Sequence, residues 1–357
     1  MKRSLLIVLA LGACLAAALL AGIQPAFAEA TADSPARALP TANEVLQELH
    51  ISDSDQQSIR NGNIVEWSPS EGSDRELALG GVLLVKTKGA DIVKLFREAS
   101  SLKMVSVITA YGKIAGDGTP ADFARVVLAP NGEKEARRYL NASPGDELNL
   151  DAKEMAGFQA LKAGGAADAV PVQKVEALVR QGLLARYQAF RTKGLSGIAP
   201  YQRGDGRQLL ASDELSIATK QLKGIAKYVP SFYDILLNYP AVETKARQDL
   251  EEQFYWLNID VFGRPTYVLS HRMLLRIGEA YVMADRHFYA SHDYNSLMQA
   301  VAALPTKDGM LVIYVSRVST DQVAGFGSSM KHPVSRAIMA PYLKDLFESL
   351  RGKVDKP

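Results

Sequence analysis

The stretch from Phe254 to Val318 reads FYWLNIDVFGRPTYVLSHRMLLRIGEAYVMADRHFYASHDYNSLMQAVAALPTKDGMLVIYVSRV and is the longest strand-like region of the chain. Between Thr266 and Ile277 one side of the expected strand carries Tyr267, Leu269, His271, Met273, Leu275 and Ile277. A period of two predicts a half-buried strand with one solvated face. Further strands are predicted over 281–292 and 310–318. Because parallel pairing would need crossover helices, their short turns predict an antiparallel meander.

The remaining segments place helices and a few strands around this meander. Strands are predicted at 64–67, 75–87 and 105–114, with Gly80-Gly81 indicating a bulge or a close approach of another group to the backbone. Helices are predicted at 43–49, 54–60, 90–99, 133–140, 151–160, 172–188, 214–227, 230–237 and 333–351. The last of these has an apolar stripe made by Ile338, Tyr342, Leu343, Leu346 and Leu350. The predicted fold class is therefore α+β, an antiparallel β meander packed against helices with a long C-terminal helix.

The first residues have the composition of a secretory signal peptide. Lys2 and Arg3 precede an apolar run from Leu5 to Ile23, and Ala26-Phe27-Ala28 fits a cleavage site before Glu29. This predicts a signal peptide over 1–28 and a protein that is periplasmic or secreted. Two alternatives stay open: an uncleaved anchor, since the apolar run approaches a membrane-spanning length, and lipidation at Cys14, because Leu11–Cys14 loosely resembles a lipobox.

The mature chain is expected to begin with a flexible tether over 29–41, rich in Ala, Pro and Ser. A small-residue linker, Gly164–Asp168, marks a weak boundary between an N-terminal α+β lobe over 42–163 and a C-terminal α+β lobe over 169–357 that contains the antiparallel sheet. A single domain is the alternative. The chain length of 357 residues accommodates either arrangement.

Composition narrows the classes of function. Hydrophobic residues make up 47% and charged residues 22% of the chain, which is ordinary for a globular protein with a real core. Removing the leader leaves 39 basic and 39 acidic residues, and a neutral chain without basic clusters is a poor candidate for binding nucleic acid. Cys14 is the single cysteine, so the mature protein is expected to be free of disulfides. No cofactor motif and no set of metal ligands is recognisable.

Two resemblances bear on the fold. The order of segments resembles an uncharacterised family of secreted bacterial proteins, through the pieces Ser58–Gly62, Arg75–Leu79, Asp122–Ala124, Ile198–Tyr201, Phe254–Trp256, Ser270-His271 and Phe288–Ser291. That family has no established activity and implies no catalytic residues. Separately, a helix, a curved meander and a closing C-terminal helix look like START-type lipid-binding folds, in which a helix across the sheet encloses an apolar cavity. This second likeness is an architectural analogy.

Several polar residues of the strand region are candidates for chemistry. His271 lies on the apolar face of its strand and is expected to be a buried, hydrogen-bonded core residue, with a polar ligand anchor as the alternative. Asp285, His287, Tyr289 and Ser291 share a face under a period of two, which superficially suggests hydrolysis. His287 and His292 would point to opposite faces, which opposes a shared metal site. Arg317 is expected to be solvated, with a role toward an acidic headgroup as the alternative.

The leading hypothesis is non-enzymatic binding of a hydrophobic or lipid-like small molecule between the sheet and the C-terminal helix. The predicted ligand-binding residues are His271, Tyr267, Met273, Tyr289 and Tyr314. The alternatives are a hydrolase that uses the face of Asp285, His287 and Ser291, and an envelope scaffold or assembly protein without a ligand. A peripheral contact with a membrane is compatible with the first and third hypotheses.

Overall fold

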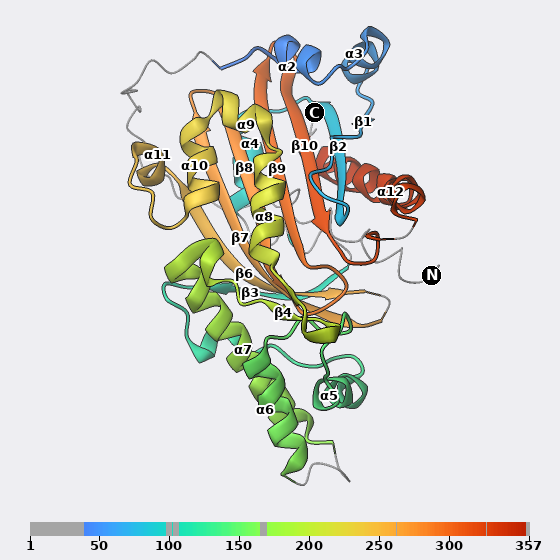
Figure 1. Ribbon diagram of the computed structural model, residues 1–357. Helices are drawn as coiled ribbons and strands as arrows, with labels where there is room; N and C mark the ends of the chain where they lie inside the picture. Colours follow the sequence, from blue (N-terminus) through green and yellow to red (C-terminus); the bar gives the residue numbers. More distant parts are fainter. Residues whose placement is uncertain are drawn as a thin grey trace.

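A computed structural model describes residues 39–97, 102, 107–164, 170–261, 263–325 and 327–354. The predicted signal peptide, Cys14 and all but the end of the predicted tether lie outside these residues. The described chain is α+β, with one large antiparallel sheet packed between helices (Figure 1). The fold class predicted from the sequence is confirmed.

The sheet has eight strands in the order β1-β2-β10-β9-β8-β7-β6-β3. Their bounds are β1 Val65–Trp67, β2 Glu76–Val85, β3 Ile108–Ile114, β6 Glu251–Asp260, β7 Pro265–Ile277, β8 Ala280–Ala290, β9 Ser296–Thr306 and β10 Gly309–Ser319. A two-stranded ribbon of β4 Tyr201–Gln202 and β5 Gln208–Leu209 is separate. Strands β6 to β10 form an antiparallel meander that contains the three predicted strands and two more, β6 and β9.

The sheet also joins segments from both sides of the predicted domain boundary. Strand β3 pairs with β6, and β10 returns to pair with β2, so strands from 42–163 form both ends of a sheet whose centre comes from 169–357. Leu39, at the end of the predicted tether, packs against the core, and Thr41 caps the first described helix.

Helices cover both faces of the sheet. Their bounds are α2 Ala42–Glu48, α3 Asp53–Arg60, α4 Gly89–Arg97, α5 Gly132–Leu140, α6 Ala152–Ala163, α7 Val172–Lys193, α8 Ala211–Lys220, α9 Lys223–Tyr228, α10 Pro230–Asn238, α11 Lys245–Gln248 and α12 Ser328–Val354. We call the face carrying Leu257, Leu274 and Tyr314, against which α4 and α12 pack, the α12 side. The face carrying Trp256 and Met273, covered by α2 and α7 to α10, is the α7 side.

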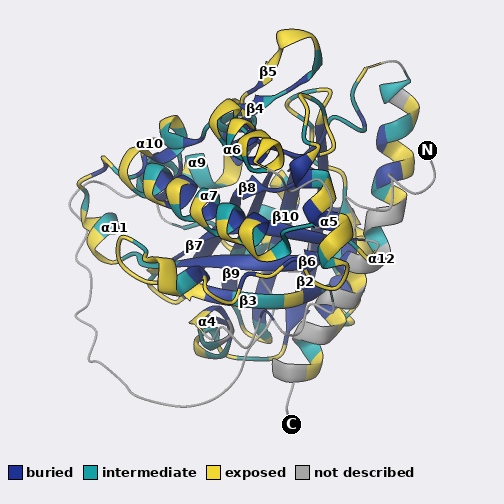
Figure 2. Cartoon of the chain, turned by 90° about the horizontal axis from the view of Figure 1, so that it is seen from below, coloured by how far each residue is buried: buried dark blue, intermediate teal, exposed yellow. Residues whose placement is uncertain are grey.

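Because both faces are covered, the expectation of a solvated strand face is wrong. In β7, Thr266, Ser270 and Arg272 fall on the predicted wet side, yet each is at most 1% exposed. Only the last two residues of β7 escape full burial. Figure 2 shows the same pattern for β2 and β7 to β10, which are buried along most of their length, whereas the end strand β3 is less buried and the helices expose their outer faces.

The glycine pair in β2 permits close packing on both faces. A Cβ atom at Gly80 would lie 2.3 Å from the Trp67 ring, and one at Gly81 would lie 2.4 Å from the ring of Phe347 on α12. The pairing of β2 with β1 and β10 continues without a bulge. The close approach predicted for Gly80-Gly81 is therefore confirmed. The missing side chain at Gly81 lets Phe347 of α12 pack directly against the backbone of β2. The apolar stripe predicted for the C-terminal helix lies on α12, and its member Leu343 is buried. The structure does not describe the side chains of the other four members, Ile338, Tyr342, Leu346 and Leu350.

Candidate functional site

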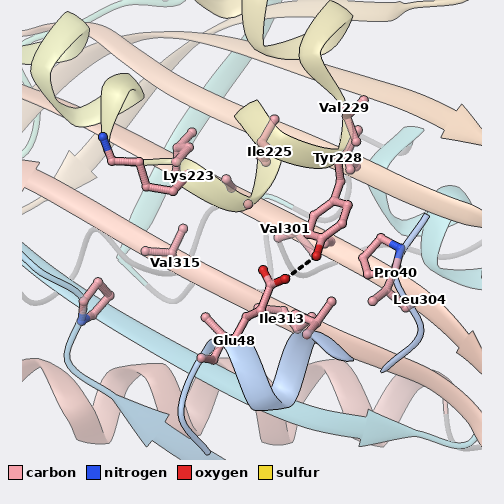
Figure 3. A pocket seen from close by; sticks show the side chains of 18 of the residues that line it. Pro40, Glu48, Lys223, Ile225, Tyr228, Val229, Val301, Leu304, Ile313 and Val315 are labelled. Atoms are coloured by element: carbon pink, nitrogen blue, oxygen red, sulfur yellow. Dashed lines mark hydrogen bonds between the residues drawn. The ribbon is translucent and has the colours of Figure 1, made fainter. Parts of the chain in front are cut away.

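An apolar pocket of about 410 Å³ lies on the α7 side, between the sheet and the helices α2 and α9 (Figure 3). Its lining comes from five separate parts of the chain: residues 39–49, 67–70, 221–229, 277–282 and 300–317. Strands β8, β9 and β10 supply the floor, while α2 and α9 stand over it. The pocket thus depends on segments that only the complete fold brings together.

The floor is hollow because its side chains are short. Ala280, Ala300 and Ala302 occupy neighbouring strands, and Val282, Ile313 and Val315 continue the same surface. Alanine carries a single methyl group, so three of them among longer aliphatic residues leave space that a leucine or phenylalanine would fill. The short side chains therefore account for the depression in this face of the sheet.

The first helix over the pocket, α2, is fixed at its start. Thr41 accepts a hydrogen bond from the Glu44 amide through its side chain, while the Glu44 carboxylate accepts one from the Thr41 amide, which together form a capping box. Leu46 is buried against the sheet, and Val45 faces the pocket. Capping and burial together hold the helix in place above the floor.

Polar contacts at the mouth of the pocket connect α2 to α9. The Tyr228 hydroxyl and the Lys227 ammonium group both donate to the carboxylate of Glu48, and Figure 3 shows the tyrosine bond crossing in front of the apolar lining. These bonds are exposed to solvent, where a single ion pair contributes little to stability, about 0–1 kcal/mol. These two bonds therefore contribute little to the free energy that holds α2 near α9.

One end of the lining is polar. Arg317 is 4% exposed, donates to the Ser70 carbonyl at 3.0 Å and pairs with Glu76 at 3.2 Å. Burial lowers the pKa of Arg317, and the charge of Glu76 opposes that shift. The expectation that Arg317 is solvated is therefore wrong, because α7-side helices and the 69–72 segment cover it. Its Nε has no hydrogen-bond partner among the described residues.

The predicted ligand-binding residues do not line this pocket. Tyr267, His271, Met273 and Tyr289 lie on the α7 side, in the core beneath α7 and α10. Tyr314 lies on the opposite face and packs edge-on against Phe347, with ring centroids 5.6 Å apart. The structure therefore brings four of the five onto one face and separates the fifth from them. The 410 Å³ pocket is also on the sheet face opposite the C-terminal helix.

His271 has the contacts of a core residue. Its ring stacks on Phe254 with centroids 4.2 Å apart, its Nε2 lies 2.9 Å from a carboxylate oxygen of Glu252, and its Nδ1 accepts from Arg286 Nε at 3.1 Å. Burial, together with the charge of Arg286, lowers the pKa of His271 to about 3, so the ring is neutral at pH 7. The expectation of a buried, hydrogen-bonded histidine is confirmed.

A β-bulge divides the residues of the hypothetical hydrolase site. Leu269 pairs with Tyr289 but Ser270 pairs with His287, so Phe288 is an extra residue that reverses the alternation. Asp285 and His287 consequently face the α12 side, while Tyr289 and Ser291 face the α7 side. The expectation that these four share a face is wrong, because it assumed an unbroken period of two.

Sequence reasoning missed the residues that form the pocket. The predicted helices contain Glu48 and Lys223 but give them no role, Tyr228 falls between two predicted helices, and the segment AVAAL at 300–304 is not assigned to a strand. The run of alanines in a strand was the available signal, because small side chains on a covered sheet face leave a depression.

Comparison with protein-family models, with curated proteins and with solved structures finds no match to this chain. Among the described residues, no group of three or more His, Cys, Asp or Glu side chains is placed to hold a metal ion. No described helix has both the length and the apolar content needed to cross a bilayer. The evidence on function is therefore the geometry of the chain itself.

Proposed function

We propose that the protein binds a predominantly apolar, lipid-like small molecule, without catalysis, in the pocket between strands β8 to β10 and helices α2 and α9. The observation that carries the proposal is the pocket of about 410 Å³ with its aliphatic floor and the indole of Trp67 in its lining. Ligand pockets in proteins typically measure about 300–1,000 Å³ and are lined mainly by apolar side chains with a few polar groups.

The polar groups of the pocket fit a ligand with one polar end. Arg317 offers its Nε, while Glu76 already neutralises most of its charge, so a hydroxyl or carbonyl oxygen fits this end better than a second full charge. The exposed hydrogen bond from Tyr228 to Glu48 lies at the mouth, where we expect a ligand to enter and leave. In this proposal the leader exports the protein, and the ligand is acquired in the periplasm or outside the cell.

The pocket contains its own spectroscopic probe. The chain has two tryptophans, of which Trp67 lines the pocket and Trp256 lies in the core, where its Nε1 donates to the Asp122 carbonyl. In a Trp256→Phe variant of the chain starting at Glu29, Trp67 is the single tryptophan. Titration with a series of fatty alcohols of increasing length should change its emission with a saturable dependence on ligand concentration.

A pair of matched variants tests the location. Ala302→Phe places a large ring on the floor and should weaken binding at least about tenfold, because it occupies volume that the ligand needs. Ala160→Phe makes the same change at an exposed position of α6, far from the pocket, and should leave the affinity unchanged. No saturable signal in the parent, or equal affinities for the two variants with intact far-UV circular dichroism, would refute the proposal.

A further inference from the structure

Three arginines and one glutamate meet where α7 ends beside α11 and β6. Arg191 of α7 and Arg247 of α11 both donate to Oε1 of Glu252, at 2.9 and 3.4 Å. Oε2 of the same carboxylate lies 2.9 Å from His271 Nε2, and the other nitrogen of that ring accepts from the buried Arg286. Among the described residues, Glu252 is the one carboxylate in ion-pair contact with Arg191 or Arg247.

This cluster carries an excess of positive charge. Burial lowers the pKa of His271 to about 3, so its ring is neutral at pH 7. Three guanidinium groups therefore face a single carboxylate, and the described residues supply no anion for two of the positive charges. Arg191 and Arg247, which share one oxygen, also repel each other, and a second anion beside them would relieve that repulsion.

The two outer arginines are held in place and still reach solvent. The guanidinium of Arg191 lies over the ring of Phe254 and that of Arg247 over the ring of Tyr239, each 5.3 Å from the centroid. The N–H bonds of a guanidinium lie in its plane, so an aromatic ring against its flat face leaves them available. The side chains of Arg191 and Arg247 are 31% and 23% exposed, which allows a small ligand to reach them.

Both arginines have donors that no described residue uses. Arg191 donates through Nη1, to Glu252 and to the Tyr239 hydroxyl, and Arg247 donates through Nη2, to Glu252. Nε and the second terminal nitrogen of each have no partner among the described residues, and these atoms are open to solvent. The Tyr239 hydroxyl accepts from Arg191, so its own proton is available to another acceptor. These donors suit a ligand group with several acceptor oxygens.

A phosphate group has the charge and the oxygen atoms that this arrangement requires. A phosphate monoester carries a charge of about −1.5 to −2 at pH 7 and three strong acceptor oxygens. Arginine binds such a group through pairs of parallel N–H···O bonds. A carboxylate has a single negative charge and two oxygens, so it would compensate only half of the excess. The charge of the cluster therefore favours phosphate over carboxylate.

We propose that Arg191 and Arg247 form a binding site for a doubly charged phosphate group, either free or as the monoester of a small molecule. The two guanidinium groups would each donate to phosphate oxygens on their solvent side, with Glu252 behind them. The site uses none of the residues that line the 410 Å³ pocket, so it is independent of the proposed function.

Calorimetric titration of the chain beginning at Glu29 tests the site at pH 7.5 in a buffer without phosphate. The probes are glycerol 3-phosphate, inorganic phosphate and acetate, compared at equal ionic strength because salt screens exposed charges. The phosphates should bind at least about tenfold more tightly than acetate, the size of one additional charge-assisted hydrogen bond. Tighter binding of glycerol 3-phosphate would support an esterified ligand, and tighter binding of inorganic phosphate the free ion. Equal affinities for phosphate and acetate, or no binding of either phosphate, would overturn the proposal.

Matched variants assign the residues. Arg191→Gln and Arg247→Gln should each weaken phosphate binding at least about tenfold. Arg60→Gln makes the same change at an exposed position of α3, on the opposite side of the molecule from α11, and should leave the affinity unchanged (Figure 1). Equal losses in all three variants would refute the assignment.

A fourth variant distinguishes binding from a merely structural role and keeps the proposal testable where an arginine variant fails to fold. Glu252→Gln removes the negative charge that competes for the two arginines and keeps the size of the side chain. It should therefore strengthen phosphate binding, although it removes ion pairs from the protein. Unchanged or weaker phosphate binding in a folded Glu252→Gln protein would contradict the proposal.

Discussion

Replacing His271 by alanine should destabilise the protein strongly and leave binding of an apolar ligand intact. The histidine Nδ1 accepts two hydrogen bonds from Arg286, from Nε at 3.1 Å and from Nη2 at 3.0 Å. Arg286 has no exposed surface, and its remaining described hydrogen bond is from Nη1 to the Leu236 carbonyl at 2.7 Å. Alanine would therefore leave two donors of a buried cation without their acceptor, whereas the Glu252 oxygen keeps its ion pair with Arg247 at 3.4 Å.

The size of the effect follows from that burial. Leaving a buried donor unsatisfied costs about 1–3 kcal/mol, and more when the group is charged, and loss of the stacked ring adds a cavity beside Phe254. Proteins are typically stable by about 5–15 kcal/mol, so the variant should lose a large share of its stability. Urea unfolding followed by far-UV circular dichroism measures this as a lower midpoint at an unchanged slope.

A double variant tests the cause. With Arg286→Met added, the stranded cation is gone, so His271→Ala/Arg286→Met should be less destabilised than the sum of the two single variants. Additive losses, or a loss below about 1 kcal/mol for His271→Ala, the size of an ordinary substitution, would refute the reasoning. Intact stability with abolished ligand binding would instead establish His271 as the ligand anchor that the sequence left open.

Three further predictions concern packing, pH and the pocket mouth. Gly81→Val should lower stability by about 1–3 kcal/mol, measured by thermal unfolding, because its side chain collides with Phe347; an unchanged midpoint would contradict that contact. Burial would raise the pKa of Glu252, but its bond to His271 and two nearby arginines lower it to about 2, so its stabilising contribution is full above pH 4.5 and is lost as the pH falls toward 2. Glu252→Gln should flatten this acid dependence of the urea midpoint, and an unchanged profile would be evidence against it. Tyr228→Phe removes a bond across the mouth to Glu48 and should speed both entry and release of an alcohol ligand in stopped-flow fluorescence, whereas identical rates would exclude gating by this bond.

The sequence predicted the positions of most helices and strands, but it did not predict which of their side chains are buried. Strands β2, β7, β8 and β10 are rich in β-branched and large apolar residues, so their composition, together with alternation in β7, locates them. Strand β9 was not predicted, because its alanines, Gln299 and Pro305 give it little strand propensity. Its extended form comes from pairing with β8 and β10. Propensity is a local quantity, and here the neighbouring strands override it.

The burial of polar residues could not be predicted from alternation. Arg272 and Asp285 alternate with apolar residues as solvated residues do, yet α4 and α12, distant in sequence, cover that face. The bulge at Phe288 was likewise invisible, since nothing in the local sequence marks the extra residue. The bulge explains why the residues of the hypothetical hydrolase site are divided between faces.

The pocket could not be predicted from the sequence either, because its lining comes from distant segments of the chain. Its floor and helix α2 come from segments more than two hundred residues apart, with α9 between them in the sequence, and each segment alone has an ordinary composition. The hydrophobic or lipid-like ligand was predicted from the order of a meander and a closing C-terminal helix, and it stays a prediction. The pocket proposed for it is visible only in the assembled sheet.

The most direct test of the central claim is native mass spectrometry of the chain beginning at Glu29, after incubation with a bacterial envelope lipid extract. The proposal predicts a bound mass that extracts into organic solvent, present in the unaltered protein and in Ala160→Phe, and lost in Ala302→Phe. A bare protein mass in all three samples, or a bound mass that persists in Ala302→Phe, would contradict binding in the pocket between the sheet and helices α2 and α9.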